Sequence, residues 1–335
     1  MSAKRRVIPV FVPHSGCPNN CVFCNQKRIS GQSAPATADT VKAAIENAVK
    51  IGLDLADCEL AFYGGSFTAI PENEQISLLS AASAIPECGG KLRLSTRPDC
   101  ISEHSLDLLR QYGVHTIELG CQSMDDEVLR QSGRGHTSAQ SERAAKLVKA
   151  YGFELILQMM TGLPGDTLEK SIATAEKLCA LSPDGVRIYP TVIIRDTPLY
   201  DMWKAGAYRE HTVAQACEWC ARIVPVFENA GIPVIRLGLN PSDELSGGEA
   251  AAGAYHPAFG EIVYARLFFN KAVSMLRKIE NADKVTLCVN IRRISQMTGQ
   301  KRQNIAELER LFPNMRINIE GKTDIPGCEI YIEKR

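Results

Sequence analysis

The sequence predicts an α/β fold built around a parallel sheet. Between residues 7 and 230, six short apolar segments alternate with amphipathic helical segments, and glycines end several of the helices. This alternation is the pattern of repeated βαβ units. Right-handed crossovers curl such a sheet into a doubly wound layer or a full or partial barrel, and periodicity alone does not choose between them. The pattern changes after residue 240, so we expect a first domain over residues 1–240 and a small α+β module over residues 241–335.

The expected elements of the first domain follow one another in regular order. Short, mostly apolar strands are expected at residues 7–12, 58–63, 92–95, 114–119, 153–159 and 185–189. Helices are expected at residues 41–52, 72–84, 102–112, 125–130, 138–150, 167–180 and 212–230. Asp39 is the expected N-cap of the first helix and Gly52 its end, because these residue types satisfy the unpaired backbone groups there.

The second part of the chain has a different composition. Residues 240–260 are rich in Gly, Ala, Pro and Ser and are expected to form a loop lying over another part of the molecule. Beyond this loop we expect helices at residues 261–279 and 295–312, and strands at residues 285–290, 315–319 and 329–333. These elements indicate a module that closes or flanks the first domain.

Composition limits the class of protein. The chain has 335 residues, of which 45% are apolar, and its 38 basic and 38 acidic residues balance. A neutral chain is not expected to coat nucleic acid non-specifically, although a local basic patch is compatible with it. We find no apolar run of membrane-spanning length and no signal peptide. Twelve cysteines without a secretory signal indicate the reducing cytoplasm.

Three cysteines near the N-terminus form the most specific motif. Cys17, Cys21 and Cys24 are spaced Cys-x3-Cys-x2-Cys. Three thiols cannot all pair with one another as disulfides, so the spacing indicates a metal or cluster site. Soft sulfur ligands favour zinc or iron–sulfur. Three alternatives remain at this point: a zinc site completed by His14, inert buried thiols, or a cluster with one iron left open.

The stretch from His14 to Gly31, with Phe23 before the last cysteine, resembles the signature of the radical S-adenosylmethionine (SAM) enzymes. That resemblance implies a partial (β/α)6 barrel in which Cys17, Cys21 and Cys24 hold a 4Fe–4S cluster whose open iron binds SAM. It further implies reductive cleavage of SAM to methionine and a 5′-deoxyadenosyl radical. A flavodoxin or ferredoxin-type protein would then donate the electron.

Glycines and polar residues follow the expected strands, where ligands bind in parallel α/β folds. Gly64 and Gly65 resemble the GGE motif of the family, which binds the methionine amino group, but Ser66 replaces the acid. Backbone carbonyls would therefore have to make that contact. A further similarity, to the oxygen-independent coproporphyrinogen oxidases, extends the set of expected cofactor-binding residues. With the aromatic residue of the signature, these are Phe23, Ser95, Gln122, Arg134 and Gln158.

A longer similarity covers roughly residues 10–240. The segments LRLSTRPDCI, IELGCQSMDDEVLRQSGRGHT and LPGDT, and the segment that follows the sixth strand, are similar to the catalytic subunit of the elongator complex. This similarity implies modification of the wobble uridine of transfer RNA. We identify no acetyl-coenzyme A signature after the barrel, so we expect the radical core without the acetyltransferase domain.

Other residues are weaker candidates. Tyr189 and Arg195 follow the sixth strand and are candidate catalytic residues that position the substrate. A local basic excess gives four candidates for RNA binding, although a solvated helix face has the same composition: Arg292, Arg293, Lys301 and Arg302. Cys217 and Cys220 lie within an expected helix, where two thiols this far apart more often pack than bind a second cluster.

Two other functions are compatible with the sequence. The first is a radical enzyme that modifies a small metabolite, which the neutral charge and the missing RNA-binding extension of the elongator subunit favour. The second is a non-catalytic protein that binds zinc and RNA. Purification without oxygen separates them, because an iron–sulfur protein is brown with an absorption near about 400 nm, whereas a zinc protein is colourless.

Overall fold

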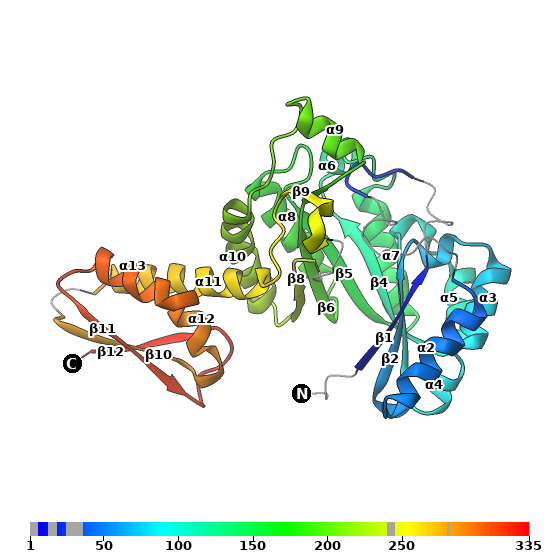
Figure 1. Ribbon diagram of the computed structural model, residues 1–335, viewed down its shortest axis with the longest axis horizontal. Helices are drawn as coiled ribbons and strands as arrows, with labels where there is room; N and C mark the ends of the chain where they lie inside the picture. The colour runs from blue at the N-terminus through cyan, green and yellow to red at the C-terminus, as the bar shows by residue number, and fades with distance from the viewer. Residues whose placement is uncertain (1–5, 13–18, 25–35, 240–244, 280–281, 335) are drawn as a thin grey trace.

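The computed structural model describes residues 6–12, 19–24, 36–239, 245–279 and 282–334 (Figure 1). Its larger part is organised on a sheet with the strand order β1-β2-β3-β4-β5-β6-β8, in which every neighbouring pair is parallel. The strands are β1 (Arg6–Val12), β2 (Cys58–Gly64), β3 (Lys91–Thr96), β4 (Val114–Gln122), β5 (Glu154–Thr161), β6 (Gly185–Pro190) and β8 (Val234–Leu237). The sheet does not close between β1 and β8, so the prediction of a partial barrel is confirmed.

Helices cover the outer face of the sheet, whereas α6 and α9 lie at its carboxyl edge (Figure 1). The helices of the larger part are α2 (Ala38–Lys50), α3 (Glu72–Ala81), α4 (Ala84–Glu87), α5 (Glu103–Gln111), α6 (Asp126–Gln131), α7 (Ser138–Ala150), α8 (Leu168–Ala180), α9 (Pro198–Lys204) and α10 (Val213–Asn229). Most of the expected ranges agree with these bounds to within a few residues. One expected range, residues 72–84, is instead divided between α3 and α4.

The start of α2 differs from the expectation. Thr37, not Asp39, is the N-cap, and it forms a capping box with Thr40. The Thr37 hydroxyl accepts from the backbone N–H of Thr40, and the Thr40 hydroxyl accepts from that of Thr37. Asp39 lies in the first turn, where a carboxylate still interacts favourably with the helix dipole. The Asp39 assignment was wrong because two neighbouring residues were both suitable caps.

Three strands were missed by the sequence analysis. β8 adds a seventh strand to the main sheet, and its four residues are too few for a periodicity to be recognised. β7 (Val192–Ile194) and β9 (Ala250–Gly253) pair antiparallel with each other. This pairing brings the segment after residue 245 back onto the barrel, as the Gly- and Ala-rich composition led us to expect.

The two faces of the main sheet have different chemistry. Leu92 and Leu94 of β3 are fully buried on the outer face, where the helices pack. Burial of each such side chain stabilises the fold by roughly 1.5–3 kcal/mol. The residues between them, Arg93 and Ser95, point to the opposite face because side chains alternate along a strand. That concave face, the lumen of the partial barrel, is therefore lined with polar groups.

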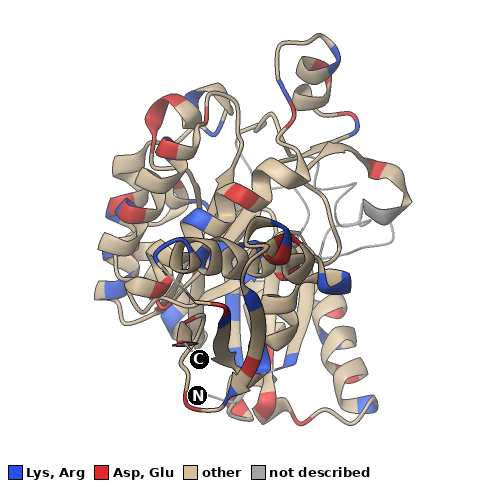
Figure 2. Ribbon diagram, turned by 90° about the vertical axis from the view of Figure 1, so that its left-hand side faces the viewer, with Lys and Arg blue, Asp and Glu red and all other residues tan. Residues whose placement is uncertain are grey.

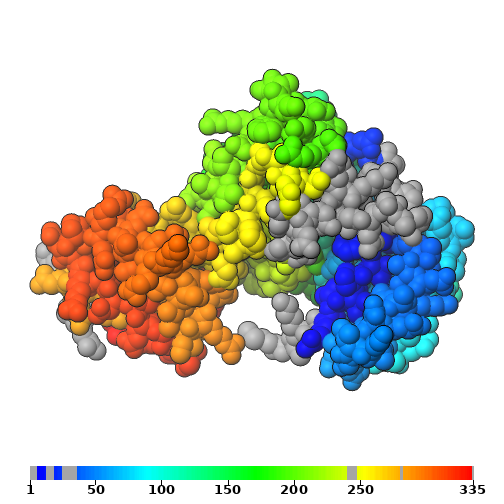
Figure 3. All heavy atoms as spheres, in the orientation of Figure 1, coloured from blue at the N-terminus to red at the C-terminus, as the bar shows by residue number. Residues whose placement is uncertain are grey.

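The C-terminal module projects from the barrel (Figures 1 and 3). The long helix α11 (Phe259–Leu276) packs against α10 and connects the barrel to the module. The module consists of β10 (Lys284–Asn290), α12 (Ile294–Thr298), α13 (Gln303–Leu311), β11 (Arg316–Lys322) and β12 (Ile330–Lys334). The strand order is β11-β10-β12, with β10 parallel to β11 and antiparallel to β12. The domain boundary after residue 240 stays a prediction.

Among the described residues, no helix combines the length and the apolar character needed to cross a bilayer.

Candidate functional site

Residues 19–24, the described part of the cysteine loop, lie at the carboxyl edge of the sheet, where α6 and α9 also lie (Figure 1). Cys21 is buried and Cys24 half-buried, whereas Cys17 and His14 lie outside the described residues. The backbone N–H of Val22 donates to the carbonyl of Ser132 (3.0 Å), and its carbonyl accepts from the N–H of Leu199 (2.9 Å). The loop is therefore held between two segments that come much later in the chain.

Glycines allow this close approach. A Cβ at Gly133 would lie 3.2 Å from the carbonyl oxygen of Asn20, and one at Gly135 only 2.4 Å from the Asn19 side chain. Both glycines also have positive φ. On the other side of the loop, Phe23 packs with α9 in a small apolar cluster. The expected contact of Phe23 with a cofactor stays a prediction.

Arg134 connects the cysteine loop to the sheet. Its Nη1 donates to Cys21 Sγ (3.5 Å) and its Nη2 to the carbonyl of Gly120 at the end of β4 (2.7 Å). Its own carbonyl accepts from Arg97 Nη2 (2.6 Å), and Arg97 forms an ion pair with Asp99. Arg134 is 7% exposed, and no carboxylate in the described part of the chain lies within ion-pair distance of it. A buried cation needs an anionic partner, so this position fits thiolates or another bound anion.

The end of β2 is tied to the end of β3. Gly64 has φ +108°, and a Cβ there would lie 2.6 Å from the carbonyl oxygen of Val12. The N–H of Gly65 donates to that same carbonyl (2.8 Å). Ser66, which takes the place of the acid, is buried, and its hydroxyl pairs with Thr96 Oγ1 (2.8 Å). The two glycines as cofactor-binding residues stay a prediction.

The other expected cofactor-binding residues lie on the ends of neighbouring strands. Gln158 Nε2 donates to Gln122 Oε1 (3.1 Å), and Gln122 has φ +66°. Ser95 Oγ is buried and lacks a hydrogen-bond partner among the described residues. His136, two residues after Arg134, is also buried. Burial lowers the pKa of His136 to about 4, so its ring is neutral at pH 7. The structure thus supplies hydroxyl, amide and guanidinium groups along one edge.

Deeper in the lumen lies a network of charges that the sequence analysis did not identify. Arg187 Nε lies 3.0 Å from Glu118 Oε2, and Arg93 Nη2 lies 3.0 Å from Glu59 Oε2. Burial raises the pKa of Glu118, although Arg187 and Arg93 oppose that rise. These residues alternate with apolar ones in β2, β3, β4 and β6, and that alternation is the signal that would have revealed them.

Of the two candidate catalytic residues, only Tyr189 belongs to this network. Arg187 donates from Nη1 to the Tyr189 hydroxyl and from Nη2 to the Tyr63 hydroxyl, both at 3.2 Å. Burial raises the pKa of Tyr189, so its hydroxyl keeps its proton at neutral pH. Arg195 is exposed, and its Nε donates to the carbonyl of Gly248 (2.9 Å). This contact fixes the segment before β9. No contact among the described residues joins Arg195 to Tyr189.

Cys217 and Cys220 are packed inside the fold. Both lie on the buried face of α10, and Cys217 Sγ donates to the carbonyl of Ile262 on α11 (3.5 Å). Burial raises the pKa of Cys217 to about 11 and that of Cys220 further. Neutral, buried thiols between two helices agree with the expected packing role.

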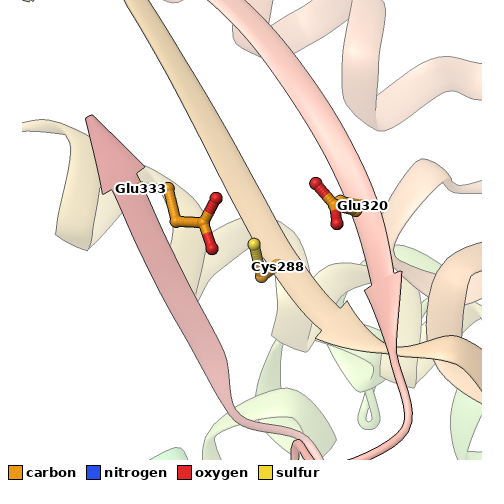
Figure 4. Close-up of side chains that lie close together, drawn as sticks. All are labelled: Cys288, Glu320 and Glu333. Carbon is orange, nitrogen blue, oxygen red and sulfur yellow. The ribbon is translucent and has the colours of Figure 1, made fainter. Parts of the chain in front are cut away.

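A second group of potential ligand atoms lies on the sheet of the module (Figure 4). Cys288, Glu320 and Glu333 come from its three strands, and their ligand atoms lie within 4.8 Å of one another. The ammonium group of Lys322 forms an ion pair with Glu333, so a positive charge already lies beside this carboxylate. Burial raises the pKa of Cys288, which disfavours the thiolate that a metal needs. We assign this cluster to ion pairing within the sheet.

The four RNA-binding candidates are not equivalent. Arg292, Lys301 and Arg302 are exposed. Arg293, in contrast, is half-buried, lies over the ring of Tyr264 (4.8 Å to its centre) and donates to Gln296 Oε1 (2.8 Å). Figure 2 shows basic and acidic residues interspersed on the side where the module lies, so any basic site there is local.

Comparison with known proteins identifies the larger part of the chain. The model of the radical SAM superfamily matches residues 11–178, and that of the radical SAM C-terminal domain matches residues 183–268. Elongator complex protein 3 of Mus musculus is 29% identical over 247 residues, which cover 67% of this chain and 44% of that protein. A tRNA uridine(34) acetyltransferase of Methanocaldococcus infernus is 30% identical over 266 residues, or 65% of this chain and 49% of that protein.

Solved structures have a similar fold. The archaeal Elp3 of Methanocaldococcus infernus, with residues 1–46 deleted, superposes with a TM-score of 0.63 at 24% identity and covers 81% of this chain and 64% of that one. The coproporphyrinogen III oxidase of Escherichia coli gives a TM-score of 0.51 at 17% identity, covering 68% of this chain and 54% of that one. The chain spans about half the length of the two curated relatives named above. Neither family model extends beyond residue 268, so β10 and the elements after it lie outside both.

Proposed function

This chain is an enzyme of the radical SAM superfamily, and from that premise we propose that it modifies a uridine base of transfer RNA. The families of its relatives support this substrate, since one of them is a tRNA uridine(34) acetyltransferase. Enzymes of the superfamily use a 4Fe–4S cluster and SAM. We propose Cys17, Cys21 and Cys24 as the ligands of the cluster.

One observation supports the cluster most directly. Arg134 is a buried cation without a described carboxylate partner, and it donates to Cys21 Sγ (3.5 Å). Three thiolates around iron and sulfide carry the negative charge that this position lacks. The donor set and the electrostatics of the described residues therefore fit an iron–sulfur cluster.

When bound, the cluster and SAM supply one electron and a 5′-deoxyadenosyl radical that removes a hydrogen atom from the next reactant. The residues of the chain bind and orient. Arg134 neutralises the thiolates, and the apolar cluster around Phe23 excludes water from one side of the loop. Ser95 Oγ and the side chains of Gln122 and Gln158 offer hydrogen bonds at the ends of β3, β4 and β5.

The floor of the lumen orients what enters it. Arg187 is fixed by Glu118 and by the hydroxyls of Tyr63 and Tyr189. This arrangement presents phenol hydroxyls rather than a mobile charge to a reactant, so it suits a largely neutral base. We propose that Tyr189 positions the base, and that a flavodoxin or ferredoxin-type protein of the cytoplasm supplies the electron.

Two measurements test this function. Protein reconstituted with iron and sulfide without oxygen is expected to absorb near about 400 nm and, once reduced, to release methionine and 5′-deoxyadenosine from SAM. Colourless protein with stoichiometric zinc and no cleavage would refute it. Nucleosides of transfer RNA from cells with and without the protein are then compared by mass spectrometry. Loss of one modified uridine, restored by the wild type but not by Cys21→Ala, is the expected result.

A second substrate class has one observation in its favour. Arg236 of β8 pairs in register with Arg187, and no ion pair joins it to a carboxylate in the described part of the chain, which suits a small acidic metabolite. Under this alternative, transfer-RNA nucleosides do not change, whereas a carboxylate-bearing metabolite accumulates in cells without the protein. The family names of the relatives favour the uridine.

A further inference from the structure

The turn between α12 and α13 has an unusual backbone. Gly299, Lys301 and Arg302 all have positive φ, at +73°, +49° and +62°. Glycine adopts such values easily, but for other residues the left-handed region is unfavourable. Two consecutive non-glycine residues in this region persist only where the surroundings fix them, and such strain concentrates at functional positions. Both strained residues here are basic and exposed.

The surroundings do fix this turn. Asn304 is buried, and its Nδ2 donates to the carbonyls of Ala265 (2.9 Å), Met297 (3.1 Å) and Gln296 (3.3 Å). These bonds join the start of α13 to the end of α12 and to α11. Gly299 packs so closely on Asn304 that a Cβ there would lie 2.9 Å from its Cγ. The turn is therefore a rigid platform for Lys301 and Arg302.

The sequence on both sides of the turn is basic. From residue 284 to residue 306 the chain carries five basic residues, Lys284, Arg292, Arg293, Lys301 and Arg302, and no acidic residue. In the part of the chain that the structure describes, neither Lys301 nor Arg302 forms an ion pair with a carboxylate. Two exposed, unpaired cations held next to each other match the phosphates of a nucleic-acid backbone. On a neutral chain this is a local site.

We propose that this turn, residues 299–302, binds the backbone of single-stranded RNA. RNA-binding modules of the K-homology type clamp the backbone with a short Gly-x-x-Gly loop. Here the turn reads Gly-Gln-Lys-Arg between two helices that connect the parallel strands β10 and β11. Arg302 occupies the last position, and its positive φ gives the backbone the conformation that a glycine would adopt.

Single-stranded RNA fits better than a duplex or a lipid surface. The exposed side chain of Ile291 (52% exposed) stands before α12, and the turn stands after it. Seven residues separate Ile291 from Gly299, and five of them form α12, which is about 7.5 Å long at 1.5 Å per residue. An apolar side chain on the other side of this short helix from two cations suits an unpaired base near its phosphates. A membrane surface would need a broader apolar face than this single residue.

The inference rests on the proposed function and deepens it, because it names the part of an RNA substrate that the module holds. The test uses the full chain and a labelled, unstructured 12-nucleotide RNA. The variant Lys301→Gly/Arg302→Gly removes both charges and keeps the turn, because glycine favours positive φ. The control Lys42→Gln/Lys50→Gln removes two exposed charges from α2, on the opposite side of the molecule.

We expect the turn variant to bind the RNA about tenfold more weakly at 0.1 M salt. The slope of log affinity against log salt should fall by about 1.4, since each phosphate contact to a single strand contributes about 0.7. The control should keep both values, and the melting temperature of the turn variant should not fall. Equal affinity of the turn variant and the wild type, or equal losses in variant and control, would overturn the inference.

Two further comparisons separate the outcomes. Binding of anionic vesicles but not RNA, with the same dependence on Lys301 and Arg302, would assign the turn to a membrane and refute the proposal. If RNA binding depends on the turn but wild-type protein never cleaves SAM, the proposed function fails while the inference stands. If transfer RNA is modified in cells but RNA binding ignores the turn, the inference fails alone.

Discussion

The barrel and the C-terminal module differ in where the charged side chains of their candidate sites lie: buried or half-buried and partnered in the barrel, exposed in the module. In the barrel, Glu118 and Arg134 are buried and Arg187 is half-buried; Arg187 pairs with Glu118, and Arg134 donates to the carbonyl of Gly120. In the module, Lys301 and Arg302 stand exposed on a rigid turn without a described acidic partner. Buried charges interact strongly with their neighbours because the local dielectric constant is low, whereas exposed charges attract a partner that brings its own charge.

This difference indicates a division of labour. The barrel has the preorganised polar interior that reactive chemistry on a small group requires. The module has a surface suited to a long, charged polymer, and β10 and the elements after it lie outside the matched family ranges. The following experiments break or sharpen this contrast, in order of decreasing expected effect.

The largest effect is expected from the cysteine loop. Replacement of Cys21 by Ala removes a proposed cluster ligand, and we expect SAM cleavage to fall by roughly three orders of magnitude or more, about 4 kcal/mol of barrier. Absorbance of the reconstituted protein reports cluster loss independently. Cys88→Ser replaces an exposed cysteine at the end of α4 and should change neither reading. A Cys21→Ala protein that keeps its colour and its activity would remove this cysteine from the ligand set.

The next effect concerns the lumen. Arg187→Met leaves Glu118 buried without its closest positive partner, and loss of one member of a buried pair costs about 3–5 kcal/mol of unfolding free energy. Urea denaturation measures this loss. Arg130→Met, which breaks the exposed pair with Glu127, is the control and should have little effect. Equal losses in the two variants would show that the lumen charges are no more coupled than surface charges.

Acid should destabilise the barrel through His211. Burial lowers the pKa of His211 to about 4, from an ordinary 6.5, so the folded protein holds this ring neutral. The unfolded chain binds its proton first, and stability is therefore lost as pH falls from 6.5 to about 4, by about 3 kcal/mol. His211→Gln should show a smaller loss over that window in denaturation at several pH values.

The control for this prediction is His104→Gln. The pKa of His104 is raised by Glu72, so its removal cannot reduce an acid-induced loss. Burial raises the pKa of Asp166 to about 6, and that contribution has the opposite sign in every variant. It therefore cancels when His211→Gln is compared with the wild type. An unchanged pH profile in His211→Gln would contradict the prediction.

The smallest effect is expected at the turn of the module. Arg302→Gly relieves a left-handed backbone conformation and should raise the unfolding free energy by about 1 kcal/mol. Arg302→Ala removes the same charge but keeps the strain, so it should not gain stability. A more stable but weakly RNA-binding glycine variant would mean that the arginine is kept for its charge, at a cost in stability. A destabilised glycine variant would mean that the arginine side chain holds the fold.

The sequence allowed much of the fold to be predicted, and the reasons are local. Alternation of apolar and helical segments gave six of the seven strands of the main sheet, but β8 is too short to recognise. Partial closure of the barrel came from the resemblance of the cysteine motif, because periodicity says nothing about curvature. The cap at Thr37 was missed because Asp39, two residues later, has an equally suitable side chain.

The candidate site was only partly predictable. Arg93 and Glu118 alternate with apolar residues, so their position in a lumen could have been read from the strand pattern. Their partners could not, because Glu59 and Arg187 lie on different strands and meet only through the sheet order. Arg293 was grouped with the exposed cations since its contact with Tyr264 joins distant segments.

The anchoring of the cysteine loop has a consequence for the order of events during maturation. The loop is made early in synthesis, yet Val22 is held by Ser132 and Leu199, which follow it by 110 and 177 residues. Until both segments have emerged and folded, these two hydrogen bonds to Val22 cannot form together. Delivery of iron and sulfide should therefore succeed only after the barrel is assembled, and a chain interrupted before residue 199 would leave the ribosome with cysteines that no scaffold donor can use.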